Sequence, residues 1–355
     1  MSFLYTGAYT EPPLGRSEGI VVYRYDDTRG TIERIQTIAG FTNPTFLATS
    51  ADERFVYAVC EAEGGAVAAF ERDPETGKIA PLNQQSSGGN GPAHISIDPS
   101  GRYALVANYG SGSVATLPIE DEGSLGEVAC LVQHEGSGPN TDRQEGPHAH
   151  MIIPTPDGRY VVAADLGSDE VITYRLDTAT GQLERRSTVR MAPGAGPRHL
   201  VFAPNRSTAW VMNELDSTIT TCDYDPETGA LTVRQTISAV AEGHDAESFA
   251  AHIVVSEDGR FVYGSNRDAS NHGHDSIVTC EVNPDTGELT AVDHTPTEGS
   301  FPRHFAFDPT GTRLLVANQK GDNLAVLVRD TATGRLSKER VIDGIPSTVC
   351  LVFCG

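Results

Sequence analysis

Histidine and arginine recur after proline at matched places along this chain. The copy richest in histidine is the segment 145–150 (EGPHAH), and related copies are 91–94 (GPAH), 196–199 (GPRH) and 301–304 (FPRH), with a degenerate AAH at 250–252. Histidine is the most common proton-transfer group in enzymes, and the arginine fork suits carboxylate and phosphate. The motif therefore predicts proton transfer beside an anion, with the groups supplied by a repeated unit.

A second motif sets the number of units. Segments such as 73–77 and 225–229 (both DPETG) place Asp, Pro and Gly at turn positions, where Pro presets φ and Gly accepts a positive φ. With looser copies included, the turn glycines are Gly30, Gly77, Gly123, Gly181, Gly229, Gly287 and Gly334, spaced by 46 to 58 residues. Seven turns predict seven units, and this period is typical of a propeller or repeat array.

Each unit has the pattern of four short strands. In the third unit, the expected strands are 94–97, 103–107, 113–117 and 126–132, which are rich in Val, Ile, Leu and Tyr. No stretch shows sustained helical periodicity with caps. The pattern predicts an all-β, seven-bladed β-propeller with four antiparallel strands per blade, forming a single domain over residues 1–355.

The two ends of the chain predict how the ring closes. Residues 3–9 align with the second strand of the other units, so the first unit lacks its own first strand. Residues 345–353 resemble an unpartnered first strand that begins at Pro346. The C-terminal strand is therefore expected to complete the first blade, which removes the exposed strand edges of an open array.

One face of the disc is expected to carry the site. The proline-histidine starts of the inner strands and the turns after the second strands fall on the same face, as do the long connections 134–146, 240–250 and 266–276. Loops on a rigid scaffold are where sites usually lie. The residues that this topology brings to that face are His148, His150, Arg198, His199, Glu214, Asn266, Arg267, Arg303, His304, Asn318 and Gln319.

The arginines allow two interpretations. A buried guanidinium is costly without a partner, so Arg198 and its neighbours could pair with Glu214 and Asp165 and simply tie blades together. Alternatively, the same groups form an anion-binding pocket with a base beside it.

Several of these segments resemble one family. The GPHAH motif, GPRH at 196–199, NELDS at 213–217, SNR at 265–267 and PRHFAFD at 302–308 are similar to the seven-bladed propeller lactonases, and the resemblance extends from residue 5 to the C-terminus. That family includes propeller-type 6-phosphogluconolactonases and carboxymuconate lactonizing enzymes. The resemblance implies catalytic roles for His148, Glu214, Arg198 and Arg267. It also implies no required metal or cofactor.

Three functions follow as expectations. The first is hydrolysis of a sugar lactone, foremost 6-phosphogluconolactone, with Arg198 and Arg267 holding the anion or oxyanion and His148 or Glu214 accepting a proton from water. His150, His199, Asn266, Arg303, His304 and Gln319 are the expected substrate-binding residues. The second is a muconate-type cycloisomerase. The third is a non-catalytic interaction platform, which the single tryptophan, Trp210, in an expected core strand does not favour.

Composition limits the partners. The formal charge is −22, with 48 acidic against 26 basic residues and only three lysines, so neither nucleic acid nor an anionic membrane is an expected partner. Such acidity is also typical of adaptation to high salt. Six scattered cysteines and no signal-peptide pattern indicate a reducing cytoplasm. The pair His272 and His274 is expected to lie in a solvated loop rather than at a metal, and the protein is expected to be a monomer or small homo-oligomer.

Overall fold

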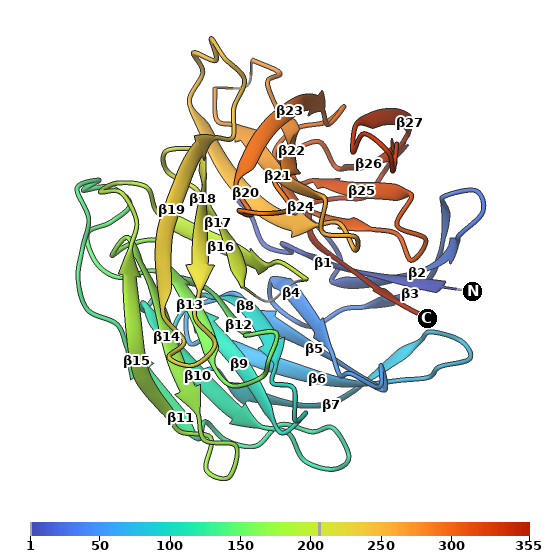
Figure 1. Ribbon diagram of the computed structural model, residues 1–355. Helices are drawn as coiled ribbons and strands as arrows, with labels where there is room; N and C mark the ends of the chain where they lie inside the picture. Colours follow the sequence, from blue (N-terminus) through green and yellow to red (C-terminus); the bar gives the residue numbers. More distant parts are fainter. Residues whose placement is uncertain (1, 205–206, 271) are drawn as a thin grey trace.

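The computed structural model describes residues 2–204, 207–270 and 272–355. The chain forms seven four-stranded antiparallel sheets, numbered here as blades in chain order, as predicted (Figure 1). Blades one to three are β28 (Thr348–Cys354), β1 (Ser2–Ala8), β2 (Ile20–Asp26) and β3 (Thr31–Ile38); β4 (Pro44–Thr49), β5 (Phe55–Cys60), β6 (Ala66–Arg72) and β7 (Ile79–Ser86); β8 (Pro92–Ile97), β9 (Tyr103–Asn108), β10 (Ser113–Pro118) and β11 (Cys130–Gln133).

Blades four to seven repeat the same order from the inner to the outer strand. They are β12 (Ala149–Pro154), β13 (Val161–Asp165), β14 (Glu170–Leu176) and β15 (Leu183–Arg190); β16 (Pro197–Phe202), β17 (Thr208–Asn213), β18 (Thr218–Tyr224) and β19 (Leu231–Ser238); β20 (Ser248–Val255), β21 (Phe261–Asp268), β22 (Ser276–Val282) and β23 (Leu289–Pro296); β24 (Pro302–Phe307), β25 (Arg313–Asn318), β26 (Asn323–Arg329) and β27 (Leu336–Asp343).

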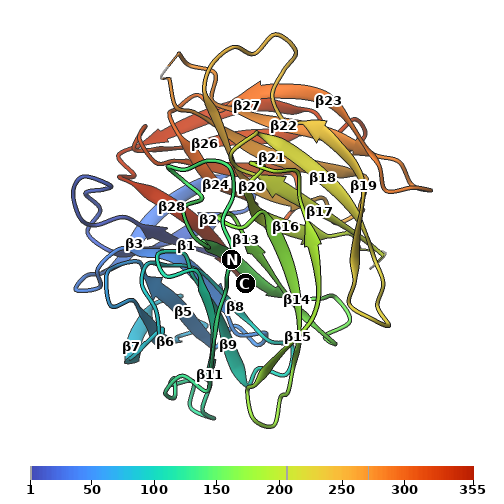
Figure 2. The ribbon, with the colours of Figure 1, turned by 90° about the vertical axis from the view of Figure 1, so that its left-hand side faces the viewer.

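The C-terminal strand closes the ring, as the sequence predicted. β28 pairs antiparallel with β1, with Phe3 opposite Cys354 and Gly7 opposite Cys350, so the two termini lie side by side (Figure 2). The strand begins at Thr348 rather than Pro346, because Ser347 adopts a left-handed φ of 52° and its amide donates to Asp322. The outer strand of blade three also begins later than expected, at Cys130, since Gly126 bonds back to Pro118 and leaves the ladder.

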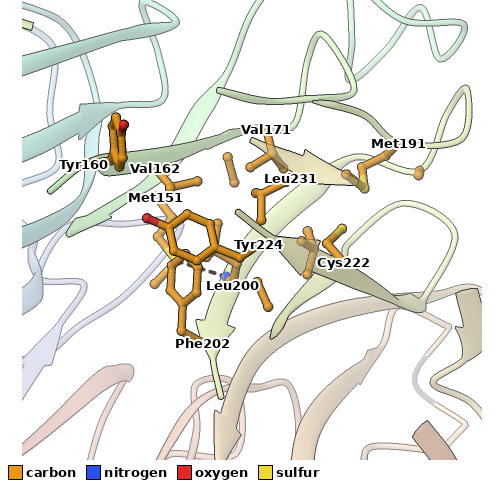
Figure 3. Packing of buried hydrophobic residues seen from close by; sticks show 14 residues of the cluster. Met151, Tyr160, Val162, Val171, Met191, Leu200, Phe202, Cys222, Tyr224 and Leu231 are labelled. Atoms are coloured by element: carbon orange, nitrogen blue, oxygen red, sulfur yellow. Dashed lines mark hydrogen bonds between the residues drawn. The ribbon is translucent and has the colours of Figure 1, made fainter. Parts of the chain in front are cut away.

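Side chains between neighbouring blades form the core. Between blades four and five, Met151, Val162, Leu200, Phe202 and Tyr224 pack together, and the amide of Leu200 lies 3.1 Å from the sulfur of Met151 (Figure 3). Such close packing of buried apolar surface supplies most of the stability of the ring.

The repeated turns also dock one blade on the next. The Trp210 indole, which is fully buried as expected, donates to the carbonyl of turn glycine Gly287 over 2.9 Å. The hydroxyls of Tyr5 and Tyr263 make the same kind of bond to Gly77 and Gly334. These bonds fix the angle between blades, and hence the positions of the inner strands that carry the site.

Candidate active site

A pocket of about 350 Å³ opens on the predicted face, above the inner strands. Five predicted site residues line it, namely His150, Glu214, Arg267, Arg303 and Gln319. A groove of similar volume, about 360 Å³, lies at the β2–β3 turn. All of its lining residues belong to that one hairpin, so it does not bring distant blades together. The convergence of several blades makes the first pocket the candidate site.

Repeat geometry explains which residues reach the pocket. The first residue of each inner strand pairs with the end of the second strand, as Pro197 does with Asn213 and Pro302 with Asn318. The next residue is Arg198 in blade five and Arg303 in blade seven. In blade four Ala149 is the residue that pairs with Asp165, so His150 occupies the place of these arginines.

A second ring comes from the residues at the ends of the second strands. In blade five, Glu214 directly follows the last strand residue, and Glu61, Tyr109 and Gln319 hold the matching place in blades two, three and seven. Arg267 holds it in blade six, since Asn266 pairs there with Ala250. Two rings of equivalent positions therefore face the same opening.

Glu214 is the centre of the charge network. It is 3% exposed, and its carboxylate lies 2.6 Å from Arg143, 2.8 Å from Arg267 and 3.0 Å from Arg198. Burial alone would raise the pKa of Glu214, but Arg267, Arg198 and Arg143 hold it well below its usual range. Glu214 is therefore a firmly ionised carboxylate.

The arginines around Glu214 are anchored to backbone as well. Arg198 donates to the carbonyl of Ala251 at 2.6 Å, and Arg267 donates to the carbonyls of Phe249 and Ala250, both at 3.1 Å. Arg198 is only 2% exposed and lies behind the pocket wall rather than in it. Its partner is Glu214, as one interpretation of the sequence expected, whereas Asp165 pairs with His134 instead.

His148 lies beside the pocket rather than in its lining. Its ring stacks on Tyr109 with centroids 4.6 Å apart, while Nδ1 lies 3.0 Å from the Tyr109 carbonyl and Nε2 lies 3.0 Å from Glu145. Its backbone amide donates to Asp165. Tyr109 itself lines the pocket, so the structure connects His148 to the site through that ring.

His150 lines the pocket and is nearly fully buried. Its Nδ1 has no hydrogen-bond partner in the part of the chain that the structure describes. Burial, followed by the neighbouring Arg198, lowers the pKa of His150 well below its usual range. The imidazole is therefore neutral near pH 7, and its Nδ1 is buried as well as unpartnered.

His199 and His304 lie in the central channel beneath the pocket. They join His94 and His252 in a buried group, with the rings of His252 and His304 stacked at 3.9 Å and Nδ1 of His199 only 2.8 Å from Nδ1 of His252. Burial lowers the pKa of both His94 and His304 to about 3. These imidazoles form a neutral floor to the site.

Asn266 and Asn318 are structural. Each side-chain amide donates to a backbone carbonyl of the neighbouring connection, Asn266 to Ala239 at 2.6 Å and Asn318 to Thr297 at 3.0 Å. Neither residue lines the pocket.

Sequence reasoning missed several pocket residues. Glu61 and Tyr109 could have been found, because they follow the second strand just as Glu214 and Gln319 do. Arg143 comes from the long connection between β11 and β12, which has no counterpart in every unit, so the repeat gave no signal for it.

The loop histidines show no metal arrangement. Within the described ranges, no group of three or more His, Cys, Asp or Glu side chains is placed to hold a metal ion. The rings of His272 and His274 are 6.2 Å apart, and both residues are exposed, as expected for a solvated loop. The described residues also form no helix that is long and apolar enough to cross a membrane.

Comparison with known proteins agrees with this fold. The family described as "Lactonase, 7-bladed beta-propeller" matches residues 3–353, and the chain belongs to it. Among its relatives, a Bacillus subtilis protein named 6-phosphogluconolactonase is 39% identical over 98% of this chain and 97% of its own length. A Formosa agariphila protein of the same name is 32% identical, covering 97% of this chain and 98% of its own.

A solved structure supports the assignment of the chain to this family. The Pseudomonas aeruginosa periplasmic gluconolactonase superposes with a TM-score of 0.93 at 33% identity, covering 100% of this chain and 99% of its own. The relatives thus carry two substrate names, with and without a phosphate, on one fold.

Proposed function

We propose that this protein hydrolyses a sugar lactone, and that its substrate is 6-phosphogluconolactone, which it converts to 6-phosphogluconate. The observation that carries the proposal is the convergence of Arg143, Arg198 and Arg267 on Glu214 at the wall of the pocket. The name of the Bacillus subtilis relative supports the choice of substrate.

The charge balance of the site favours an anionic substrate. Five cationic side chains share this region with two carboxylates, Glu61 and Glu214; the cations are Arg143, Arg198, Arg267, Arg303 and Lys320. The whole chain carries −22, so this excess of positive charge is local. A cationic cleft in an acidic protein concentrates the field on a small anion.

His150 is the proton acceptor in this proposal. Glu214 and His148 were the candidates from the sequence, but three arginines make Glu214 a weak base, and both ring nitrogens of His148 already have partners. His150 is neutral, and its ring lines the pocket. An anionic substrate in the pocket adds negative charge beside the ring, which moves its pKa back towards neutrality.

The reaction then proceeds in two steps. Water attacks the lactone carbonyl while its proton passes to His150, and the oxyanion that forms is stabilised by the guanidinium groups of Arg143 and Arg267. The ring C–O bond breaks next, and the departing alkoxide takes the proton from His150. The products are a free hydroxyl and a carboxylic acid, which loses its proton to solvent and becomes a carboxylate; no redox step or metal is required.

The test is a lactone panel measured against the spontaneous background rate. The purified protein, with and without a chelator, would be offered 6-phosphogluconolactone, glucono-δ-lactone and 3-carboxy-cis,cis-muconate. We expect the highest kcat/KM with the phosphorylated lactone, unchanged by the chelator. Activity on the muconate alone would point to cycloisomerisation, and failure to accelerate any of the three would refute an enzyme of this class.

We further propose that the protein acts in the cytoplasm. All six cysteines are unpaired in the structure, and five of them are buried, as suits a reducing compartment. The periplasmic relative makes this worth testing. Cell fractionation with the native gene should recover the protein with cytoplasmic markers, and recovery with periplasmic markers would contradict the proposal.

A further inference from the structure

We propose that Arg303, Lys320 and Gln319 of blade seven form a subsite for a phosphate monoester, separate from the arginines that bind Glu214. The inference rests on the proposed function for the identity of the substrate. It assigns the two ends of that substrate to different side chains of the pocket, with the lactone carbonyl at His150 and Arg267 and the phosphate at Arg303 and Lys320.

Arg303 differs from the other arginines of the pocket in having no polar partner. Among the described residues it makes no hydrogen bond and no ion pair, whereas Arg143 and Arg267 both bind Glu214. Its five N–H donors are therefore all available to a ligand. A free guanidinium fork in a pocket wall has the geometry for two oxygens of one phosphate.

Tyr9 and Glu61 hold Arg303 in place without forming an ion pair with it. The guanidinium lies over the ring of Tyr9, 5.4 Å from its centroid. The Tyr9 hydroxyl donates to Glu61 at 2.8 Å, and Thr45 donates to the other oxygen of Glu61 at 2.7 Å. Both carboxylate oxygens of Glu61 are thus engaged. Burial alone would lower the pKa of Arg303, but Tyr9, followed by Glu61 and Glu214, outweighs burial and raises it.

Lys320 supplies a second free cation at the rim. Its ammonium lies 3.8 Å from the ring centroid of Phe301 and pairs with no carboxylate in the described part of the chain. A phosphate monoester carries about −1.5 to −2 charges at neutral pH. Two cations therefore balance its charge, whereas they would exceed the single charge of a carboxylate ligand. The chain has only three lysines, so this one stands out on an acidic surface.

Gln319 completes the wall of the subsite with an amide that is held in place. It is 6% exposed and lines the pocket, and its Nε2 donates to the carbonyl of Leu14 at 3.2 Å. That bond fixes the orientation of the amide, and Oε1 is left buried without a partner among the described residues. A buried unsatisfied acceptor is costly, so a small rotation of the amide that lets a sugar hydroxyl reach Oε1 would be favourable.

The test measures product binding, which requires no turnover. Titration calorimetry would compare 6-phosphogluconate with gluconate on the wild type, Arg303→Met, Arg303→Lys and Lys320→Met. We expect the wild type to prefer the phosphorylated acid at least tenfold. Arg303→Met and Lys320→Met should each reduce that preference tenfold or more, and Arg303→Lys should retain part of it, because it keeps the charge and loses the fork.

Lys78→Met is the matched control, since Lys78 is exposed in the β6–β7 turn on the opposite face and its removal changes the net charge equally. It should keep the wild-type preference. Lys320 is exposed, so its variant tests the subsite even if Arg303→Met melts early. Equal affinity of the wild type for the two acids, or an unchanged preference in Lys320→Met and Arg303→Lys, would overturn the subsite.

The two proposals can fail separately. A phosphate preference lost in the variants, with no lactone hydrolysed, would keep the subsite and reject the proposed reaction. Hydrolysis of lactones with no phosphate preference in binding would keep the reaction and reject the subsite.

Discussion

Arg143 donates to Glu214 over 2.6 Å, although 71 residues separate them in the chain. Arg143 belongs to the long connection between β11 and β12 and is one-third exposed, whereas Glu214 follows β17 and is buried. The bond holds the connection between blades three and four against the part of the pocket wall that blade five forms. Part of the pocket therefore depends on a contact that no repeat unit contains.

Replacement of Arg143 should weaken substrate binding more than folding. In Arg143→Met, we expect KM to rise about tenfold, equivalent to ~1.4 kcal/mol, because one cation is lost and the loop is released. The melting temperature should fall by only a few degrees, since the side chain is partly in solvent. Steady-state kinetics with a melting curve of each sample would check both values, and an unchanged KM would contradict the role given to this loop.

The channel histidines predict loss of stability on mild acidification. Burial lowers the pKa of His94 and His304 to about 3 in the folded protein, against 6.5 for the exposed side chain. Below pH 6.5 the unfolded chain therefore takes up protons that the folded chain does not, and each such histidine costs about 1.4 kcal/mol per pH unit. The stabilisation is complete above pH 6.5 and is lost as the pH falls.

Melting temperatures at pH 7.5 and 5.5 measure this loss of stability. Both pH values lie above the range in which most carboxylates titrate, so the histidines dominate the difference. His304→Phe is a suitable comparison, because Phe46 holds the matching place in blade two. The variant should show a smaller difference between the two pH values. Equal melting temperatures for the wild type at pH 7.5 and 5.5 would contradict the account of the channel.

The sequence predicted the fold more completely than it predicted the site. The turn glycines and the unpartnered C-terminal strand were sufficient for the number of blades and for closure, because each reflects local chemistry that repeats. The place of His148 was not accessible in this way. Its Gly-Pro precedes the inner strand by two residues more than in blade five, and only the pairing of Ala149 with Asp165 reveals that His150 takes the position of Arg198.

Loss of the C-terminal strand should be severe. Deletion of residues 346–355 removes β28, which pairs along the length of β1 and buries Val349, Cys350 and Leu351. The truncation would expose the edge of β1 and open the core between blades one, two and seven. We expect an aggregated product or a melting temperature that is lower by about 15 °C or more, because a large loss of stability shifts the melting temperature in proportion to the entropy of unfolding. A truncated protein that melts with the wild type would refute closure by β28.

High salt should stabilise the protein. Its formal charge of −22 produces self-repulsion that an ionic strength of 1 M, with a Debye length of about 3 Å, largely screens. Exposed ion pairs lose strength in the same range but contribute little each. Melting in 0.05 M and 2 M potassium chloride should show a clear rise, and a flat or falling profile would speak against adaptation to a saline cytoplasm.

The central claim is that a neutral His150 accepts the proton of the attacking water in a pocket organised by Glu214. Its most direct test is to measure kcat with 6-phosphogluconolactone for His150→Ala, Glu214→Gln and His148→Ala, together with the melting temperature of the same samples. We predict that kcat falls by about 10²–10⁴-fold in His150→Ala with the fold retained, by a comparable factor in Glu214→Gln, and by less in His148→Ala, whose ring acts through Tyr109. A His150→Ala enzyme that is folded and turns over at the wild-type rate would contradict the claim.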